Sequence, residues 1–182
     1  VGRLLGETDS SQLSAVSVNL SMQQFMSPDL IKDLQSLSSQ YQFEPGRLKL
    51  ELTERVLTED IPRMHQIMGQ LHQMGFQFAL DDFGTGYSNL SAVLDCSFSS
   101  IKLDRSLIQG YPENKRSAFL VNAMMNLFHH MECQVVAEGV ENESQAQALI
   151  SQGVDWIQGF YYASPMPEAE FLQFLNGQKQ AR

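Results

Sequence analysis

The sequence has few of the features that mark disulfide-bonded or membrane-spanning proteins. Only two cysteines, Cys96 and Cys133, occur in 182 residues, and neither has partners at metal-ligand spacing. This number excludes a disulfide-rich scaffold, and we expect two reduced, buried thiols. No apolar run approaches the ~20 residues that cross a bilayer, which excludes a membrane-spanning helix.

Basic residues are also scarce. Lysine and arginine together number 12 against 21 acidic residues, for a net charge of -9. This charge disfavours nucleic-acid polymers as partners, and we expect no membrane contact. A phosphate-containing ligand is compatible with it, because carboxylates can bind divalent cations that face the phosphate. The sequence has neither an initiator methionine nor a signal peptide, so we expect a cytoplasmic piece of a longer protein whose upstream domains could anchor it to a membrane.

The chain reads as one globular domain, residues 1–182, with 43% hydrophobic and 18% charged residues. Short apolar or β-branched runs alternate with longer amphipathic segments. We expect strands over 15–20, 48–52, 76–81, 100–104, 134–138 and 155–159. We expect helices over 28–41, 61–74, 115–131, 144–152 and 168–175.

Strands that alternate with helices predict an α/β fold with a parallel sheet. Six such units fit neither a small open sheet nor a complete (β/α)₈ barrel, which usually takes about 250 residues. The count therefore favours a TIM-like barrel that lacks its first part.

Polar residues follow the expected strands, and they gather at the carboxyl ends. In a parallel barrel these ends meet on one face, which carries the active site. Several carboxylates close together would repel one another unless cations compensate them. Oxygen ligands without a histidine or cysteine cluster indicate a hard cation such as Mg²⁺ or Mn²⁺. The residues concerned are Asn19, Glu51, Asp81, Asp82, Lys102, Asp104, Glu138 and Gln158.

The sharpest local motif is Asp81-Asp82-Phe83-Gly84-Thr85-Gly86-Tyr87-Ser88. Adjacent carboxylates can bridge two metal ions, and the two glycines permit a mobile loop that could couple metal occupancy to conformation. Purely structural roles stay open for three other acids. Glu54 and Glu141 fit helix starts, where the dipole favours acids, and Asp104 could pair with Arg105 or Lys102.

These motifs closely resemble the EAL family of bacterial cyclic di-GMP phosphodiesterases. The similarity covers about 15–175, with five or six motifs in order at compatible spacing. They are Ser17-Val18-Asn19-Leu20-Ser21, Glu51-Leu52-Thr53-Glu54, the Asp-Asp loop, Ile101-Lys102-Leu103-Asp104-Arg105, Val136-Ala137-Glu138-Gly139-Val140-Glu141 and Gln158-Gly159-Phe160.

The resemblance implies a TIM-like barrel in which two Mg²⁺ or Mn²⁺ ions activate the water that hydrolyses cyclic di-GMP to linear pGpG. It assigns metal binding to Asn19, Glu51, Asp81, Asp82 and Glu138. It implies that Lys102 acts on the attacking water, with Glu138 and Gln158 beside it. It gives Glu54 the role of anchoring the Asp-Asp loop, and it makes Asp104 and Glu141 ligand-binding or supporting acids. It also implies a homodimer through residues 88–99 and 112–131.

One departure from the family is large. The Glu-Ala-Leu triplet that names it, whose glutamate is a metal ligand, does not occur in this sequence. We therefore expect an N-terminally incomplete domain that lacks one or two strands and is inactive or weak on its own. Two alternatives stay open: a non-catalytic cyclic di-GMP receptor, or a protein-interaction module that works through a dimer.

Overall fold

Six parallel strands form one sheet in the computed structural model, which describes residues 1–58, 60–86 and 90–178. The strands lie side by side in sequence order, so β1 and β6 are the two edges. The predicted parallel α/β architecture is confirmed, and every expected strand lies within two residues of its predicted bounds. The strands are β1 (Val16–Asn19), β2 (Leu48–Thr53), β3 (Gln77–Phe83), β4 (Ser100–Leu103), β5 (Gln134–Glu138) and β6 (Trp156–Gln158).

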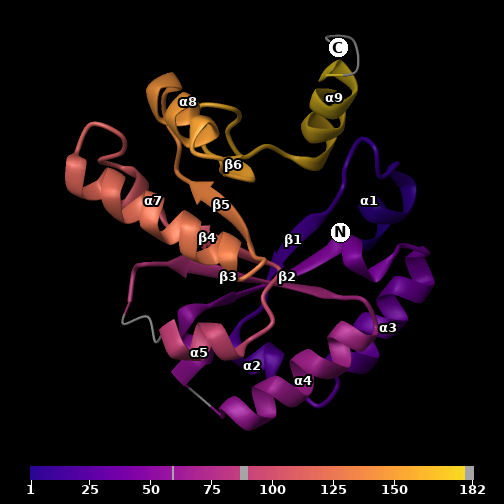
Figure 1. Cartoon of the computed structure of the whole chain (residues 1–182). Helices are drawn as coiled ribbons and strands as arrows, with labels where there is room; N and C mark the ends of the chain where they lie inside the picture. Colours follow the sequence, from indigo (N-terminus) through magenta and orange to yellow (C-terminus); the bar gives the residue numbers. More distant parts are fainter. Residues whose placement is uncertain (59, 87–89, 179–182) are drawn as a thin grey trace.

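Helices surround the strands in an open arc (Figure 1). The five expected helices are confirmed as α3 (Leu30–Tyr41), α4 (Ile61–Gln73), α7 (Lys115–His130), α8 (Glu143–Ser151) and α9 (Glu168–Gln178). Short helical segments escaped prediction because they are too brief to show a period. These are α1 (Gly2–Glu7), α2 (Met22–Phe25), α5 (Leu90–Asp95), α6 (Arg105–Ile108) and the 3₁₀ turns η1 (Pro45–Arg47) and η2 (Glu54–Thr58).

Strand β2 shows how the sequence separates the two faces of the sheet. Leu48, Leu50 and Leu52 are buried, and they belong to the apolar core that includes the inward residues of the helices. Lys49 and Glu51 alternate with them and point to the other face, because successive side chains of a strand point to opposite sides. The outer face of the sheet therefore packs against helices, and the inner face is free to carry polar groups.

Side-chain caps set the helix boundaries. Ser21 and Gln24 form a capping box at α2, and Asn114 and Asn142 accept hydrogen bonds from the first-turn amides of α7 and α8. These bonds satisfy donors that a helix start would otherwise leave without a partner. Gly75 follows α4 with a φ of 92°, a left-handed conformation that glycine adopts readily.

The sheet is not closed, because β1 and β6 do not pair with each other. An ion pair of 2.7 Å between Arg3 of α1 and Glu168 of α9 joins the first and last helices beside this opening. Both side chains are largely exposed, so the pair contributes little stability. The chain thus forms an open half-barrel. Among the residues that the structure describes, no helix combines the length and apolar composition that crossing a membrane would require.

Candidate functional site

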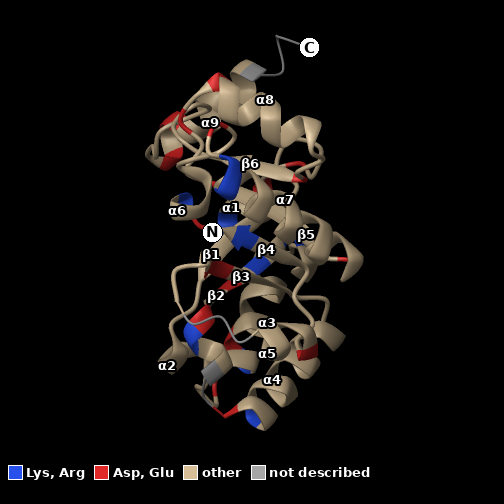
Figure 2. Ribbon diagram, turned by 60° about the vertical axis from the view of Figure 1, so that its left-hand side comes forward, with Lys and Arg blue, Asp and Glu red and all other residues tan. Residues whose placement is uncertain are grey.

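The ammonium of Lys102 lies among carboxylates from three neighbouring strands. Its Nζ is 3.0 Å from Glu51 Oε1, 2.7 Å from Asp81 Oδ1 and 2.8 Å from Glu138 Oε1. The four side chains are between 7% and 14% exposed, so water screens these interactions only weakly. Figure 2 shows acidic and basic residues lying together within the central strands. The structure therefore brings together four of the residues that the sequence selected.

Strand register explains this convergence. Glu51 lies opposite Ala79 across the β2–β3 pair, and Asp81 is the next residue of β3 on the same face. Lys102 of β4 lies opposite Val136, and Glu138 is the next inward residue of β5. Inward positions near the carboxyl ends of four consecutive strands thus carry the charged groups, as a parallel barrel requires of its active-site rim.

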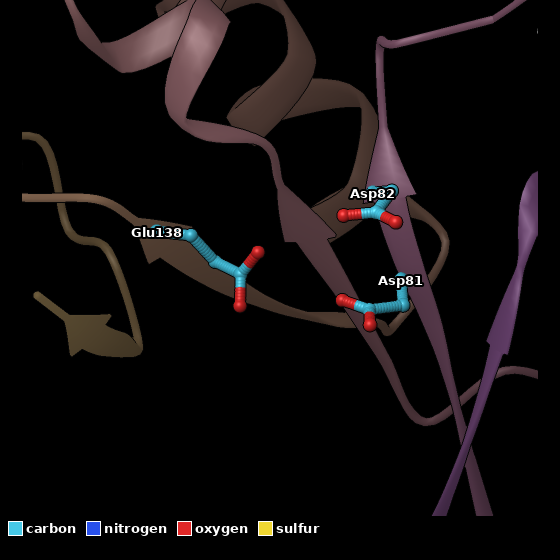
Figure 3. Close-up of side chains that lie close together, drawn as sticks. All are labelled: Asp81, Asp82 and Glu138. Atoms are coloured by element: carbon cyan, nitrogen blue, oxygen red, sulfur yellow. The ribbon is translucent and has the colours of Figure 1, made fainter. Parts of the chain in front are cut away.

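A bulge in β3 turns a second carboxylate toward the same point. Adjacent residues of a regular strand face opposite sides, so Asp81 and Asp82 would normally diverge. The β3–β4 register shifts between Leu80 and Phe83, and Asp82 has a φ of 55°. A positive φ in a residue other than glycine stores strain and is typical of functional sites. The result is visible in Figure 3, where both aspartates approach Glu138.

The three acids have the geometry of a cation site. Ligand oxygens of Asp81, Asp82 and Glu138 all lie within 4.8 Å of one another. Asp81 Oδ1 is buried and has no hydrogen bond of acceptable geometry, although the Lys102 Nζ is close to it. The carboxylates of Glu51, Asp81 and Glu138 around the single ammonium of Lys102 leave negative charge in excess. Buried charge of one sign requires compensation. The donor set of carboxylate oxygens fits Mg²⁺ or Mn²⁺.

The pKa values of the rim side chains reflect the close packing of several carboxylates around one ammonium. Burial raises the pKa of Asp82, and repulsion from Asp81 and Asp104 raises it further. Burial also raises the pKa of Glu138, against the opposing attraction of Lys102. Burial by itself would lower the pKa of Lys102, but the short contacts of its ammonium with the Asp81 and Glu138 carboxylates outweigh burial and hold the pKa above its ordinary value. Lys102 is therefore a fixed cation at neutral pH.

Glu54 contacts the loop that follows β3. Its Oε1 accepts a hydrogen bond of 2.6 Å from the amide of Gly84, and a Cβ on Gly86 would lie 3.0 Å from its Oε2. Gly84 has a φ of 102° and packs against Leu107, so a side chain has no room there. This contact joins η2 to the first part of the Asp-Asp loop. The loop's later residues, 87–89, lie outside the described part of the chain.

Asp104 and Glu141 lie just beyond the carboxylate cluster. Asp104 caps α6 by accepting from the amide of Ser106 at 2.9 Å. Burial would raise the pKa of Asp104, but hydrogen bonds from Ser106 and the charge of Arg105 lower it. Glu141 Oε1 lies 2.7 Å from the Arg105 guanidinium, between side chains about half exposed. Arg105 thus pairs with Glu141, a partner that sequence spacing alone did not indicate.

Asn19 and Gln158 occupy the two edges of the rim. Asn19 ends β1 opposite Glu51, and Gln158 ends β6 opposite Glu138. Both are exposed. Each of them lies on the strand next to one that carries a carboxylate of the cluster. Among the described residues, no hydrogen bond joins either side chain to the cluster.

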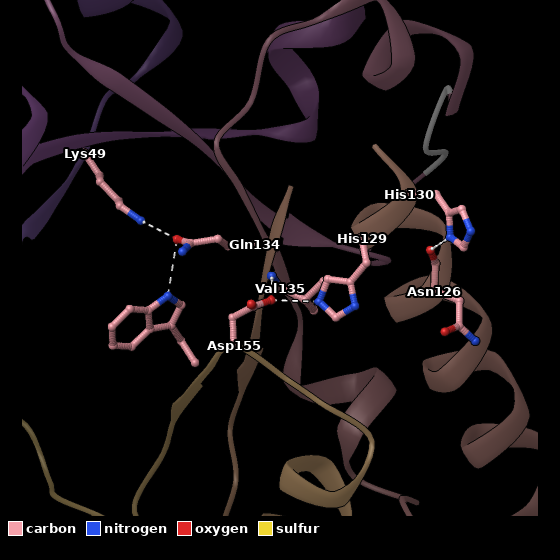
Figure 4. A network of polar contacts seen from close by, with 8 residues as sticks. Lys49, Asn126, His129, His130, Gln134, Val135 and Asp155 are labelled. Atoms are coloured by element: carbon pink, nitrogen blue, oxygen red, sulfur yellow. Dashed lines mark hydrogen bonds and ion pairs between the residues drawn. The ribbon is translucent and has the colours of Figure 1, made fainter. Parts of the chain in front are cut away.

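A second polar network lies near the amino ends of the strands (Figure 4). The Gln134 Oε1 accepts from Lys49 Nζ and from the indole of Trp156, each at 3.2 Å. Asp155 Oδ2 accepts from the amide of Val135 and lies 2.8 Å from the His129 ring. These residues were not selected from the sequence, because none of them follows a strand. They tie β2, β5 and β6 together at the opposite end from the rim.

Sequence reasoning also missed Gln145, a buried polar residue in the first turn of α8. Its side chain contacts the segments that follow both β4 and β5. A signal was available, because Asn142 and Gln145 have the spacing of a helix cap and its third residue.

Comparison with known proteins gives a consistent family. The EAL domain model matches residues 2–165. The chain is 32% identical over 162 residues to the cyclic di-GMP phosphodiesterase RocR of Pseudomonas aeruginosa, covering 89% of this chain and 41% of the relative. It is 35% identical over 161 residues to the cyclic di-GMP phosphodiesterase PdeR of Escherichia coli, covering 88% of this chain and 24% of the relative. The chain thus spans less than half the length of both relatives.

Comparison with solved structures indicates the same family. The crystal structure of the EAL domain of Mycobacterium smegmatis DcpA has a TM-score of 0.89 at 28% identity, covering 97% of this chain and 80% of that one. A cyclic di-GMP complex of the PaMucR phosphodiesterase has a TM-score of 0.79 at 34% identity, covering 86% of this chain and 64% of that one. The fold, the ordered motifs and the rim of carboxylates around Lys102 lead to one conclusion: the chain belongs to the EAL domain family.

Proposed function

We propose that this domain hydrolyses cyclic di-GMP to linear pGpG with divalent cations, as part of bacterial second-messenger signalling in the cytoplasm. The observation that carries the proposal is the rim cluster, in which Lys102 contacts three carboxylates and Asp82 lies beside them. Support also comes from relatives named as cyclic di-GMP phosphodiesterases.

The cations would be held by rim oxygens from neighbouring strands. Asn19, Glu51 and Asp81 would bind one Mg²⁺ or Mn²⁺. Asp81 would also contribute to a second ion together with Asp82 and Glu138, whose oxygens already lie close to those of Asp81. Two such ions, when bound, stabilise the attacking and leaving oxygens of an in-line displacement at phosphorus.

The other rim residues would position water and substrate. The Lys102 ammonium would donate a hydrogen bond that orients the attacking water, and Glu138 would hold that ammonium in place through their contact of 2.8 Å. Gln158 would support the same water from β6. Hydrolysis adds one water across one P–O bond: the hydroxyl stays on phosphorus and a proton goes to the departing ribose oxygen.

Three further acids would support the site from outside the cluster. Glu54 would fix the Asp-Asp loop through the Gly84 amide. Asp104 and Glu141 would hold the segments that follow β4 and β5, through the α6 cap and the Arg105 ion pair.

We also propose a homodimer through residues 88–99 and 112–131. Large apolar side chains in these segments are exposed, at 54% for Leu94, 77% for Phe119 and 41% for Leu120. Exposed apolar side chains grouped on neighbouring segments are typical of protein interfaces. One cavity, of about 430 Å³, is lined by Leu94 and Met131 from the two segments, which places them side by side.

A receptor that binds without cleaving is the second candidate for this chain on its own. Asn19 and Gln158 lie exposed at sheet edges, and the sequence contains no Glu-Ala-Leu triplet to supply a further carboxylate. Such a rim could hold a cyclic dinucleotide through one cation without completing the second site.

Product analysis separates the two candidates. The purified 182-residue chain and its expected longer parent are incubated with cyclic di-GMP and Mn²⁺, and pGpG is quantified by chromatography. We expect rapid production by the parent and little by the short chain, with Asp81→Asn abolishing turnover in the parent. Lys102→Ala should lower kcat far more than substrate affinity. Binding without any pGpG from the parent would establish the receptor instead.

A further inference from the structure

Gln145 joins two segments that lead directly away from the rim cluster. It lies in the first turn of α8, is 5% exposed, and makes a different hydrogen bond at each end of its carboxamide. Its Oε1 accepts from the amide of Glu141 at 2.9 Å, and its Nε2 donates to the carbonyl of Ile108 at 3.3 Å. Glu141 lies three residues after Glu138, and Ile108 six residues after Lys102.

Strand pairing cannot hold these two segments together. The β4–β5 ladder ends at the Leu103–Ala137 pair, one residue before Glu138. Beyond it the chain enters α6 on one side and a loop on the other, where Gly139 has a φ of 66°. A Cβ at Gly139 would overlap the Arg105 side chain, so the loop packs closely on α6. Side-chain contacts must therefore fix the distance between the two segments.

The side chains of Arg105 and Gln145 both span this gap, and the two interactions differ in strength. The Arg105–Glu141 ion pair lies between side chains that are 54% and 45% exposed, where water and salt weaken it. The Gln145 bonds are buried, and a buried polar group that loses its partner is strongly penalised. A carboxamide can also accept at Glu141 and donate at Ile108 simultaneously without carrying a charge.

We propose that Gln145 is a positioning residue that holds Glu138 against Lys102 and thereby sets the affinity of the rim for divalent cations. The inference rests on the proposed function, because it assigns the rim a cation-binding role. Gln145 itself touches neither the cluster nor a cation. It acts through the backbone that carries Glu138, as residues behind a metal ligand commonly do.

The test compares two chemically identical changes on α8. Gln145→Met removes both hydrogen bonds and keeps the side-chain length, whereas Gln147→Met alters an exposed residue of the same helix whose bond is to Glu143. Mn²⁺ binding to the full chain is measured by calorimetry, well below the unfolding temperature of each variant. We expect Gln145→Met to weaken Mn²⁺ binding about tenfold, and Gln147→Met to leave it unchanged.

Further arms separate positioning from simple loss of stability. Leu149→Ala opens a cavity in the buried face of α8 and should lower Tm without changing Mn²⁺ affinity. Gln145→Glu keeps the acceptor for Glu141 but loses the donor to Ile108, so it should bind Mn²⁺ better than Gln145→Met. Equal Mn²⁺ affinity in Gln145→Met and Gln147→Met would overturn the positioning role and leave the proposed function standing. No Mn²⁺ uptake by the unsubstituted chain would overturn both.

Discussion

Lys102 and Glu138 lie on adjacent strands, and their charged groups are 2.8 Å apart at the rim of the open sheet. Because Glu51 and Asp81 contact the same ammonium, Lys102 is the counter-ion for the whole cluster. A divalent cation bound at the rim would also neutralise the negative charge of these carboxylates. We therefore expect the stability of the fold to depend on metal when Lys102 is removed.

Replacing Lys102 by methionine should therefore destabilise the metal-free chain. Removing one partner from a buried ion pair costs about 3 kcal/mol or more, and for a chain of this size that lowers Tm by about 10 °C. Mn²⁺ should restore Tm by a larger increment than it adds to the unsubstituted chain, because it compensates the orphaned carboxylates. Lys32→Met is the control, because Lys32 is an exposed lysine of α3. A Lys102→Met Tm that does not respond to Mn²⁺ would contradict this assignment.

Glu54 should control turnover through the Asp-Asp loop. Glu54→Ala removes the acceptor for the Gly84 amide, and we expect it to lower kcat of the proposed hydrolysis about tenfold because the rim loses its alignment. Glu54→Gln keeps an acceptor oxygen and should retain more activity than Glu54→Ala. The measurement is steady-state kinetics, which give kcat for Glu54→Ala and Glu54→Gln. Equal kcat in the two variants would show that the hydrogen bond to Gly84 is unimportant.

A charge on α7 should disrupt the proposed dimer. Phe119 is 77% exposed, and Phe119→Glu would place a carboxylate in the interface, weakening association at least about tenfold. Ile150→Glu is the control, because Ile150 is 59% exposed but lies on α8, outside the proposed segments. Sedimentation analysis over a concentration series provides the readout. A chain that stays monomeric at every concentration, or a dimer indifferent to Phe119→Glu, would exclude this interface.

The buried thiol of Cys96 should make stability fall at alkaline pH. Burial raises the pKa of Cys96 from 9.0 to about 11, so the folded chain holds this proton more tightly than the unfolded chain. Its stabilising contribution is complete below pH 9 and is lost as pH rises toward 11. The difference in Tm between the unsubstituted chain and Cys96→Ala should shrink across this interval. A constant difference would show that the thiol ionises equally in both states.

The sequence predicts the sheet and its rim well because both follow from local patterns. Apolar alternation defines the strands, and polar residues at their ends mark the rim. Once the strands are located, parallel pairing in sequence order is enough to predict the half-barrel around Lys102.

Contacts between residues that are distant in sequence could not be predicted from these local patterns. The bulge that turns Asp82 toward Glu138 depends on a register shift between strands, and no residue pattern in β3 records it. The Arg105–Glu141 ion pair was not predicted either, because the two residues are distant in sequence and meet only through the fold.

The cation site at the rim is tested most directly by calorimetric titration of the metal-free chain with Mn²⁺, comparing Asp81→Asn with Asp33→Asn. Asp81 presents a buried oxygen without an aligned hydrogen bond at the centre of the rim, whereas Asp33 is exposed on α3. We expect the unsubstituted chain and Asp33→Asn to bind Mn²⁺ alike and Asp81→Asn to bind it about tenfold more weakly. Equal Mn²⁺ binding by all three chains would contradict this expectation.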